Sequence, residues 1–133
     1  MINQLWYEAL LKPLYTPPNW VFQPAWIVLY ITILLSFVLF LFSNNKDSKT
    51  EGLFYFILQL VFNILWTPSF FYLKNPPLAL LIIIILDIFV IYTIKEFYKI
   101  SKVAGLLLIP YFLWLIFATY LNLGIVYLNP LQI

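Results

Sequence analysis

Four long apolar runs constrain this chain more than any other feature of its sequence. They cover about residues 20–42, 53–73, 77–100 and 103–128. A helix needs about 20 residues to cross a hydrocarbon core of about 30 Å, so each run is long enough to span a membrane. Spanning strands alternate apolar and polar residues, whereas the run LALLIIIILDIFVIY does not. We therefore expect an all-α integral membrane bundle with four visible transmembrane helices, forming one domain over residues 1–133.

The composition points the same way and excludes several classes of site. Of the 133 residues, 65% are hydrophobic and 9% are charged, whereas soluble domains carry about 25% charged residues. The chain has no cysteine and no histidine, which excludes disulfides, Cys/His metal sites and histidine-based triads. Its basic residues are scattered lysines, and a nucleic-acid interface needs a cluster. We expect the lipid bilayer as the surroundings, with no metal, no required cofactor and no nucleic-acid partner.

The lysines predict how the bundle is oriented. The connections expected over residues 43–52 and 98–102 lie at one end of the bundle, and Lys95 lies near the same end. Five of the seven lysines fall there, whereas Lys12 and Lys74 fall at the other end. Because cytoplasmic connections are enriched in lysine and arginine, we predict that the 43–52 and 98–102 loops are cytoplasmic.

The second apolar run carries a polar stripe, QLVFNILW. Gln59, Asn63 and Trp66 are spaced i, i+4, i+7, so they share one face of a helix. Two amides on that face should avoid lipid, where unpaired polar groups cost free energy. They could form hydrogen bonds between helices, or they could form the polar floor of an apolar pocket.

The fourth run carries a stepped face. Trp114, Ala118 and Leu121 share that face, with Asn122 beside them. A large aromatic residue one turn from a small one suits a flat ligand stacked on the indole, and it equally suits close approach of another helix.

Two prolines lie inside predicted helices. Pro68 falls in the second run and Pro110 in the fourth, and each removes a backbone donor and tends to bend its helix. Such bends could splay the helices and leave a cavity, or they could be tolerated features of packing.

Asp87 lies near the middle of the third run, in LIIIILDIFV. An acid at membrane depth is costly, and it is a functional candidate by default. Asp87 is therefore a possible proton site, and a small proton-coupled transporter centred on it is one alternative function.

Three stretches together resemble the TspO/MBR family, the tryptophan-rich sensory or translocator proteins. They are WYEALLKPLYTPPNWVFQPAWIVLY, QLVFNILWTPSFF and LLLIPYFLWLIFATYLN, in family order and with family-like spacing. The resemblance implies a five-helix membrane bundle, commonly a homodimer, of which the first helix is missing from this sequence. It also implies a pocket for porphyrins such as protoporphyrin IX and haem, and in animal members for cholesterol.

The resemblance implies a function and a set of ligand-binding residues. The aromatic and proline-rich residues 1–19 would form a lid over the pocket. We expect a sensor, carrier or scavenger of tetrapyrroles, with sterol-like ligands less well supported and a porphyrin photo-oxidising enzyme as an alternative. The ligand-binding residues implied by matching positions are Tyr7, Trp26, Gln59, Asn63, Trp66, Trp114, Ala118 and Leu121.

Overall fold

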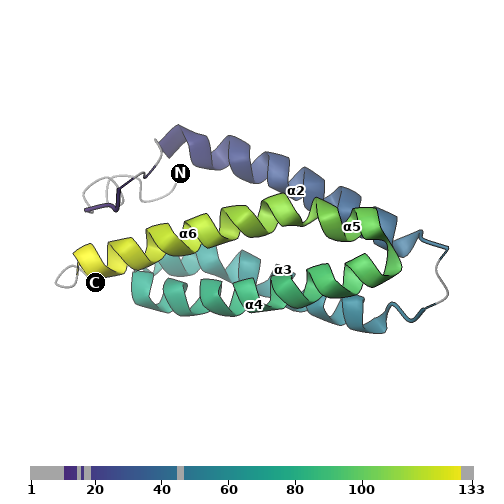
Figure 1. Cartoon of the computed structure of the whole chain (residues 1–133). Coiled ribbons are helices and arrows are strands. Elements are labelled where there is room, and N and C mark those ends of the chain that lie inside the picture. The colour runs from purple at the N-terminus through teal and green to yellow at the C-terminus, as the bar shows by residue number, and fades with distance from the viewer. Residues whose placement is uncertain (1–10, 15, 17–18, 45–46, 130–133) are drawn as a thin grey trace.

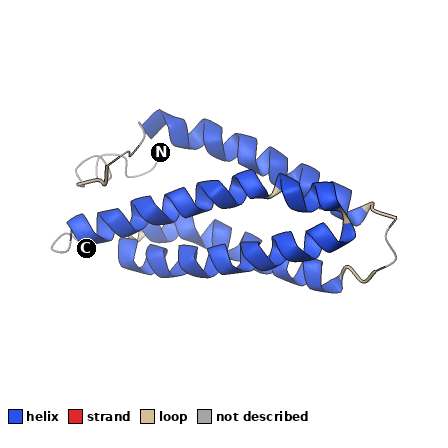
Figure 2. Cartoon of the chain, viewed as in Figure 1, coloured by secondary structure: helices blue, strands red, loops and turns tan. Residues whose placement is uncertain are grey.

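The computed structural model describes residues 11–14, 16, 19–44 and 47–129. Every regular element in this part of the chain is helical, which confirms the predicted all-α class (Figure 2). The elements are α2 (Asn19–Leu41), α3 (Thr50–Thr67), the π-helical turn η1 (Pro68–Tyr72), α4 (Pro76–Ile100), α5 (Lys102–Leu107) and α6 (Ile109–Leu128) (Figure 1).

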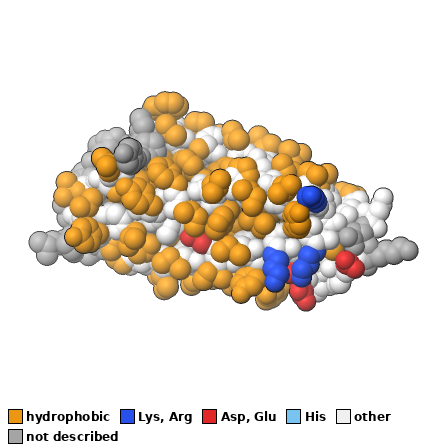
Figure 3. All heavy atoms as spheres, in the orientation of Figure 1, with side chains coloured by type: hydrophobic (Ala, Val, Ile, Leu, Met, Phe, Trp, Pro, Cys, Tyr) orange, Lys and Arg blue, Asp and Glu red, His pale blue; other side chains and the backbone are white. Residues whose placement is uncertain are grey.

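The described residues form four stretches that can cross a membrane, as predicted. These are Trp20–Leu41, Thr50–Phe70, Pro76–Ile100 and Lys102–Leu128. The outer surface of the bundle is largely apolar, while the described lysine and glutamate side chains in view gather near one end (Figure 3). An apolar outer surface is stable in lipid and not in water, so the chain is an integral membrane protein.

Two helix connections are shorter than predicted. α4 ends at Ile100, where the third predicted helix ends, and α5 starts at Lys102, so the connection is shorter than residues 98–102. Ser101 alone makes the turn, with φ −145° and ψ 114°, and its side chain accepts a hydrogen bond from Ala104 N. The link expected over residues 43–52 is also shorter, since α3 begins at Thr50. The Ser101 side chain thereby caps the first turn of α5.

The fourth span is broken into two helices. A single helix was predicted over residues 103–128, but α5 ends at Leu107 and α6 begins at Ile109. Pro110 lies in the first turn of α6, where its missing N–H has no intrahelical partner to lose. The second span changes geometry at Pro68, where η1 begins, and Leu73 N donates to Pro68 O at 2.9 Å. Both prolines therefore mark changes of helix geometry, as bending prolines should.

The buried core lies where α3, α4 and the α5–α6 span meet. Its members include Leu86, Val90, Phe97, Leu108 and Leu115, all nearly inaccessible. α2 joins this core toward its C-terminal end: Phe40 stacks on Phe97 at 4.0 Å between ring centroids, and Ser36 Oγ donates to Ala104 O at 2.6 Å. In Figure 1, α2 lies against α5 at that end and diverges from α6 toward its own N-terminus.

Candidate functional site

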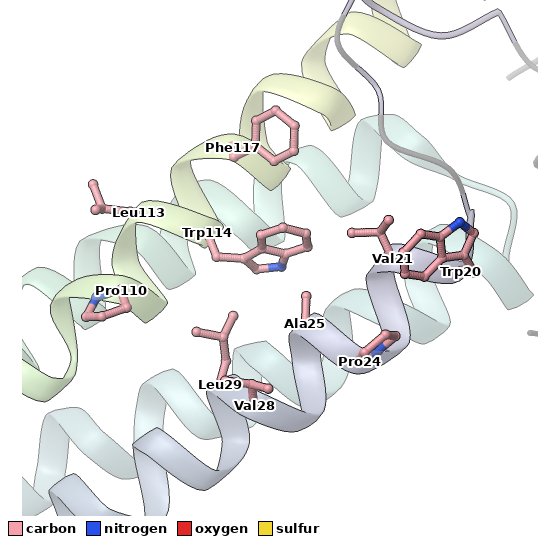
Figure 4. A pocket seen from close by; sticks show the side chains of 10 residues that line it. All are labelled: Trp20, Val21, Pro24, Ala25, Val28, Leu29, Pro110, Leu113, Trp114 and Phe117. Carbon is pink, nitrogen blue, oxygen red and sulfur yellow. The ribbon is translucent and has the colours of Figure 1, made fainter.

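An apolar groove lies between α2 and α6, where the two helices diverge. Its volume is about 660 Å³. Figure 4 shows Trp114 of α6 opposite Ala25 and Leu29 of α2. The lining residues are Trp20, Val21, Pro24, Ala25, Val28, Leu29, Pro110, Leu113, Trp114 and Phe117. Val28 and Leu113 are each more than half exposed, at 61% and 62%. The groove therefore opens on the lipid-facing surface of the bundle.

Trp114 is the predicted site residue that lines this groove. Its indole meets Phe22 edge-on at 6.0 Å between ring centroids and Trp26 edge-on at 6.3 Å. The indole Nε1 is buried and has no hydrogen-bond partner. A buried N–H without an acceptor is uncommon and costs free energy.

Trp26 lies behind the groove wall. It is half-buried, it packs against the core, and its ring lies 5.6 Å from that of Tyr30. Its ring meets that of Trp114, so two of the three predicted tryptophans lie side by side between α2 and α6. Trp26 supports the indole of Trp114, and the surface of the groove beside it comes from Ala25 and Leu29.

The two amides of the predicted polar stripe lie in a chain of hydrogen bonds. Tyr30 OH donates to Asn63 Oδ1 at 2.7 Å, Asn63 Nδ2 donates to Tyr111 OH at 2.7 Å, and Tyr111 OH donates to Gln59 Oε1 at 2.8 Å. This chain joins α2, α3 and α6 through side chains that are buried in the cases of Gln59, Asn63 and Tyr111. Of the two alternatives for these amides, the structure contains the hydrogen bonds between helices. A role in ligand binding stays a prediction.

Trp66 takes part in a second polar contact, farther along α3. Its Nε1 donates to Asn122 Oδ1 at 3.0 Å, and Asn122 Nδ2 donates to Pro76 O at 2.9 Å. Asn122 is thereby the polar centre that links α3, α6 and the start of α4. Trp66 does not line the groove.

Part of the stepped face predicted on α6 is packed inside the bundle. Ala118 and Leu121 are buried, at 5% and 4% exposure, and neither lines the groove. Of the two alternatives for this face, the structure contains the close approach of another helix. A role in ligand binding stays a prediction. Tyr7, the predicted lid tyrosine, and most of residues 1–19 lie outside the described residues.

Asp87 is buried at the interface of α4 and α6. Thr119 Oγ1 lies 2.6 Å from Asp87 Oδ2, and Asp87 Oδ1 is buried without a partner. The structure thus supplies a partner for the carboxyl that the sequence did not reveal, and it is a neutral hydroxyl.

Most of the groove lining was missed by sequence reasoning. Pro110, Leu113, Trp114 and Phe117 are spaced i, i+3, i+4, i+7, which is one face of a helix. That spacing could have identified the α6 wall. The tyrosines that complete the polar chain, Tyr30 and Tyr111, had no comparable signal, because aromatic residues are frequent throughout the chain.

The comparison with known families agrees with this architecture. The model of the TspO/MBR family matches residues 1–128. This chain belongs to the TspO/MBR family. A tryptophan-rich protein TspO of Archaeoglobus fulgidus is 46% identical over 129 residues, which cover 95% of this chain and 81% of that protein.

More distant TspO/MBR members are similar over nearly the same range. A tryptophan-rich protein TspO of Chlorobaculum tepidum is 39% identical over 126 residues, covering 94% of this chain and 80% of that protein. The human translocator protein is 33% identical over 121 residues, covering 88% of this chain and 70% of that protein. The family assignment therefore applies to the membrane bundle as a whole.

Proposed function

We propose that this TspO/MBR protein binds a tetrapyrrole in the groove between α2 and α6 and acts in the membrane as its sensor, carrier or scavenger. The observation that carries the proposal is an apolar groove walled by the indole of Trp114, whose buried Nε1 has no partner. The names of two relatives, sensory protein and translocator protein, support a role as sensor or carrier.

The size and chemistry of the groove suit a flat apolar ring system. Its volume of about 660 Å³ lies within the range of small-molecule sites, about 300–1,000 Å³. The faces of aromatic side chains such as Trp114 stack on flat rings. The chain offers neither histidine nor cysteine, so a strong axial bond to haem iron has no donor of those types.

The groove also suggests a route of entry. Val28 on α2 and Leu113 on α6 form its outer rims and are exposed on the surface that faces lipid. An apolar macrocycle dissolves in the bilayer, so it can enter sideways between α2 and α6. This route would deliver the ligand to the face of Trp114 without crossing the polar ends of the bundle.

The test fills the groove with one larger side chain and leaves every tryptophan in place. Val28→Phe adds an aromatic ring at the rim, and Val38→Phe makes the same change on the same helix. Val38 is also exposed, at 41%, and it does not line the groove. Each variant, in lipid nanodiscs, is titrated with protoporphyrin IX while the porphyrin absorbance is followed.

We expect Val28→Phe to weaken binding about tenfold or more, a loss of about 1.4 kcal/mol, and Val38→Phe to bind like the unchanged protein. Equal binding by all three would place the ligand elsewhere, and no saturable binding by the unchanged protein would refute a tetrapyrrole function. Excess cholesterol, added as a competitor, distinguishes a sterol-like ligand that shares the groove.

A further inference from the structure

We infer that Asp87 and Thr119 form a proton-binding site between α4 and α6, in which Asp87 holds the proton and donates it to the threonine hydroxyl. This inference is independent of the groove and of any ligand. It rests on how many hydrogens the two side chains can supply for the contacts around them.

Thr119 has two close oxygen neighbours and one hydrogen to give. Its Oγ1 lies 2.6 Å from Asp87 Oδ2 and 2.8 Å from Leu115 O. A backbone carbonyl can only accept, and a threonine hydroxyl in a helix commonly donates to the carbonyl four residues before it. If Thr119 donates its hydrogen to Leu115 O, the 2.6 Å contact between Thr119 Oγ1 and Asp87 Oδ2 needs a hydrogen from another source. Only a protonated Asp87 can supply it.

The ionised alternative leaves too few donors. A carboxylate accepts at both oxygens, yet Asp87 Oδ1 is buried and has no partner. Thr119 would then have to divide its single hydrogen between Asp87 Oδ2 and Leu115 O. An unpaired charge in this apolar setting costs far more than an unpaired neutral carbonyl. With Asp87 protonated, Asp87 Oδ2 donates to Thr119 Oγ1 and Thr119 Oγ1 donates to Leu115 O, so each short contact has its own hydrogen.

Among the described residues, the groups around the site offer no compensating positive charge. On α4, the nearest described charged side chains are Lys95 and Glu96, which lie about 12 Å farther along at 1.5 Å per residue. On α6, the titratable side chain near enough to interact electrostatically is Tyr111, which can be neutral or negative but never positive. On α3, the described Tyr55 stacks on Tyr92 of α4 at 5.1 Å between ring centroids. Neither tyrosine can carry a positive charge.

The position of the proton gives it a structural consequence. The Asp87–Thr119 bond joins α4 to α6 near the middle of both helices, and Asn122 joins them again where Nδ2 donates to Pro76 O. Removal of the proton would leave Asp87 as an anion with at most half of a hydrogen bond. The proton therefore contributes to the α4–α6 interface, beside the apolar packing of Leu86 and Leu115.

The chain offers a direct test because its sequence contains two aspartates, Asp47 and Asp87. Protein labelled with ¹³C at the aspartate carboxyl carbons gives two nuclear magnetic resonance signals in lipid. Asp47 is exposed in the connection between α2 and α3, far along the chain from Asp87. An Asp47→Asn variant assigns the two signals, because only the Asp87 signal remains.

We expect the Asp87 signal to have the chemical shift of a protonated acid at neutral pH, where an aspartate in water is ionised. A carboxylate shift for Asp87 at neutral pH would overturn the inference. A second arm uses Thr119→Val, which removes the acceptor. We expect it to move the Asp87 signal, while Thr32→Val on the exposed side of α2 leaves it in place. An Asp87 signal unmoved by Thr119→Val would refute the pairing.

Discussion

The side-chain amide of Asn129 binds both backbone polar groups of Leu11. Leu11 N donates to Asn129 Oδ1 at 2.9 Å, and Asn129 Nδ2 donates to Leu11 O at 2.7 Å. Nearby, Tyr120 OH donates to Leu14 O at 2.6 Å. The described part of the segment before α2 is therefore fastened to the C-terminal half of α6, across 118 residues of sequence.

Replacement of Asn129 should release this segment. Asn129→Ala removes the two hydrogen bonds to Leu11 and a third, from Asn129 Nδ2 to Ile125 O, each contributing about 0.5–1.5 kcal/mol net. We expect hydrogen exchange at the Leu11 amide to become about tenfold faster or more, with little change in the middle of α4. Asn44→Ala, at an exposed asparagine near the opposite end, is the control and should leave Leu11 unchanged. Unchanged exchange in Asn129→Ala would mean that the two bonds do not hold the segment.

Tyr111 should be important for stability because its hydroxyl serves two buried amides. Tyr111→Phe leaves Gln59 Oε1 and Asn63 Nδ2 without this partner. A buried polar group left unpaired costs about 1–3 kcal/mol, so we expect a clear loss of thermal stability in detergent. Tyr127→Phe, on the same helix at a side chain 81% exposed, should have little effect. Equal melting temperatures for the two variants would contradict the buried chain of hydrogen bonds.

Gly105 allows α5 to approach the end of α4. A Cβ at this position would lie 2.7 Å from Tyr98 Cβ and 2.8 Å from Tyr98 Cα, and backbone cannot move aside as a side-chain tip can. We expect Gly105→Ala to destabilise the bundle by about 1–3 kcal/mol, the usual cost of overpacking. Val103→Ala, at an exposed position of α5, serves as the control in the same denaturation measurement. An unchanged midpoint in Gly105→Ala would show that the turn at Ser101 can open.

The orientation predicted from the lysines can be tested with single cysteines, because the chain has none of its own. Ser48 and Leu73 are both exposed, in connections that α3 separates. With the lysine-rich end in the cytoplasm, we expect an impermeant maleimide outside intact cells to label Leu73→Cys and to spare Ser48→Cys. The reverse pattern would invert the orientation.

The spans could be predicted from the sequence because each depends on local composition. A run of about 20 apolar residues must form a helix in lipid, since no water is available to the backbone. The breaks and turns between helices could not be predicted in this way. The break at Leu108 and the one-residue turn at Ser101 depend on how α5 packs against α4, and a hydropathy profile carries no information on that contact.

The candidate site shows the same division. The sequence by itself determined the membrane class, the family, and the inward-facing stripe of Gln59 and Asn63, because apolar runs, motifs and helical spacing are properties of neighbouring residues. Only the tertiary structure decided the partners: Tyr111 for the two amides, Thr119 for Asp87, and an open groove beside Trp114. These contacts join residues 32 to 52 positions apart or walls on different helices, so they exist only once the helices have packed.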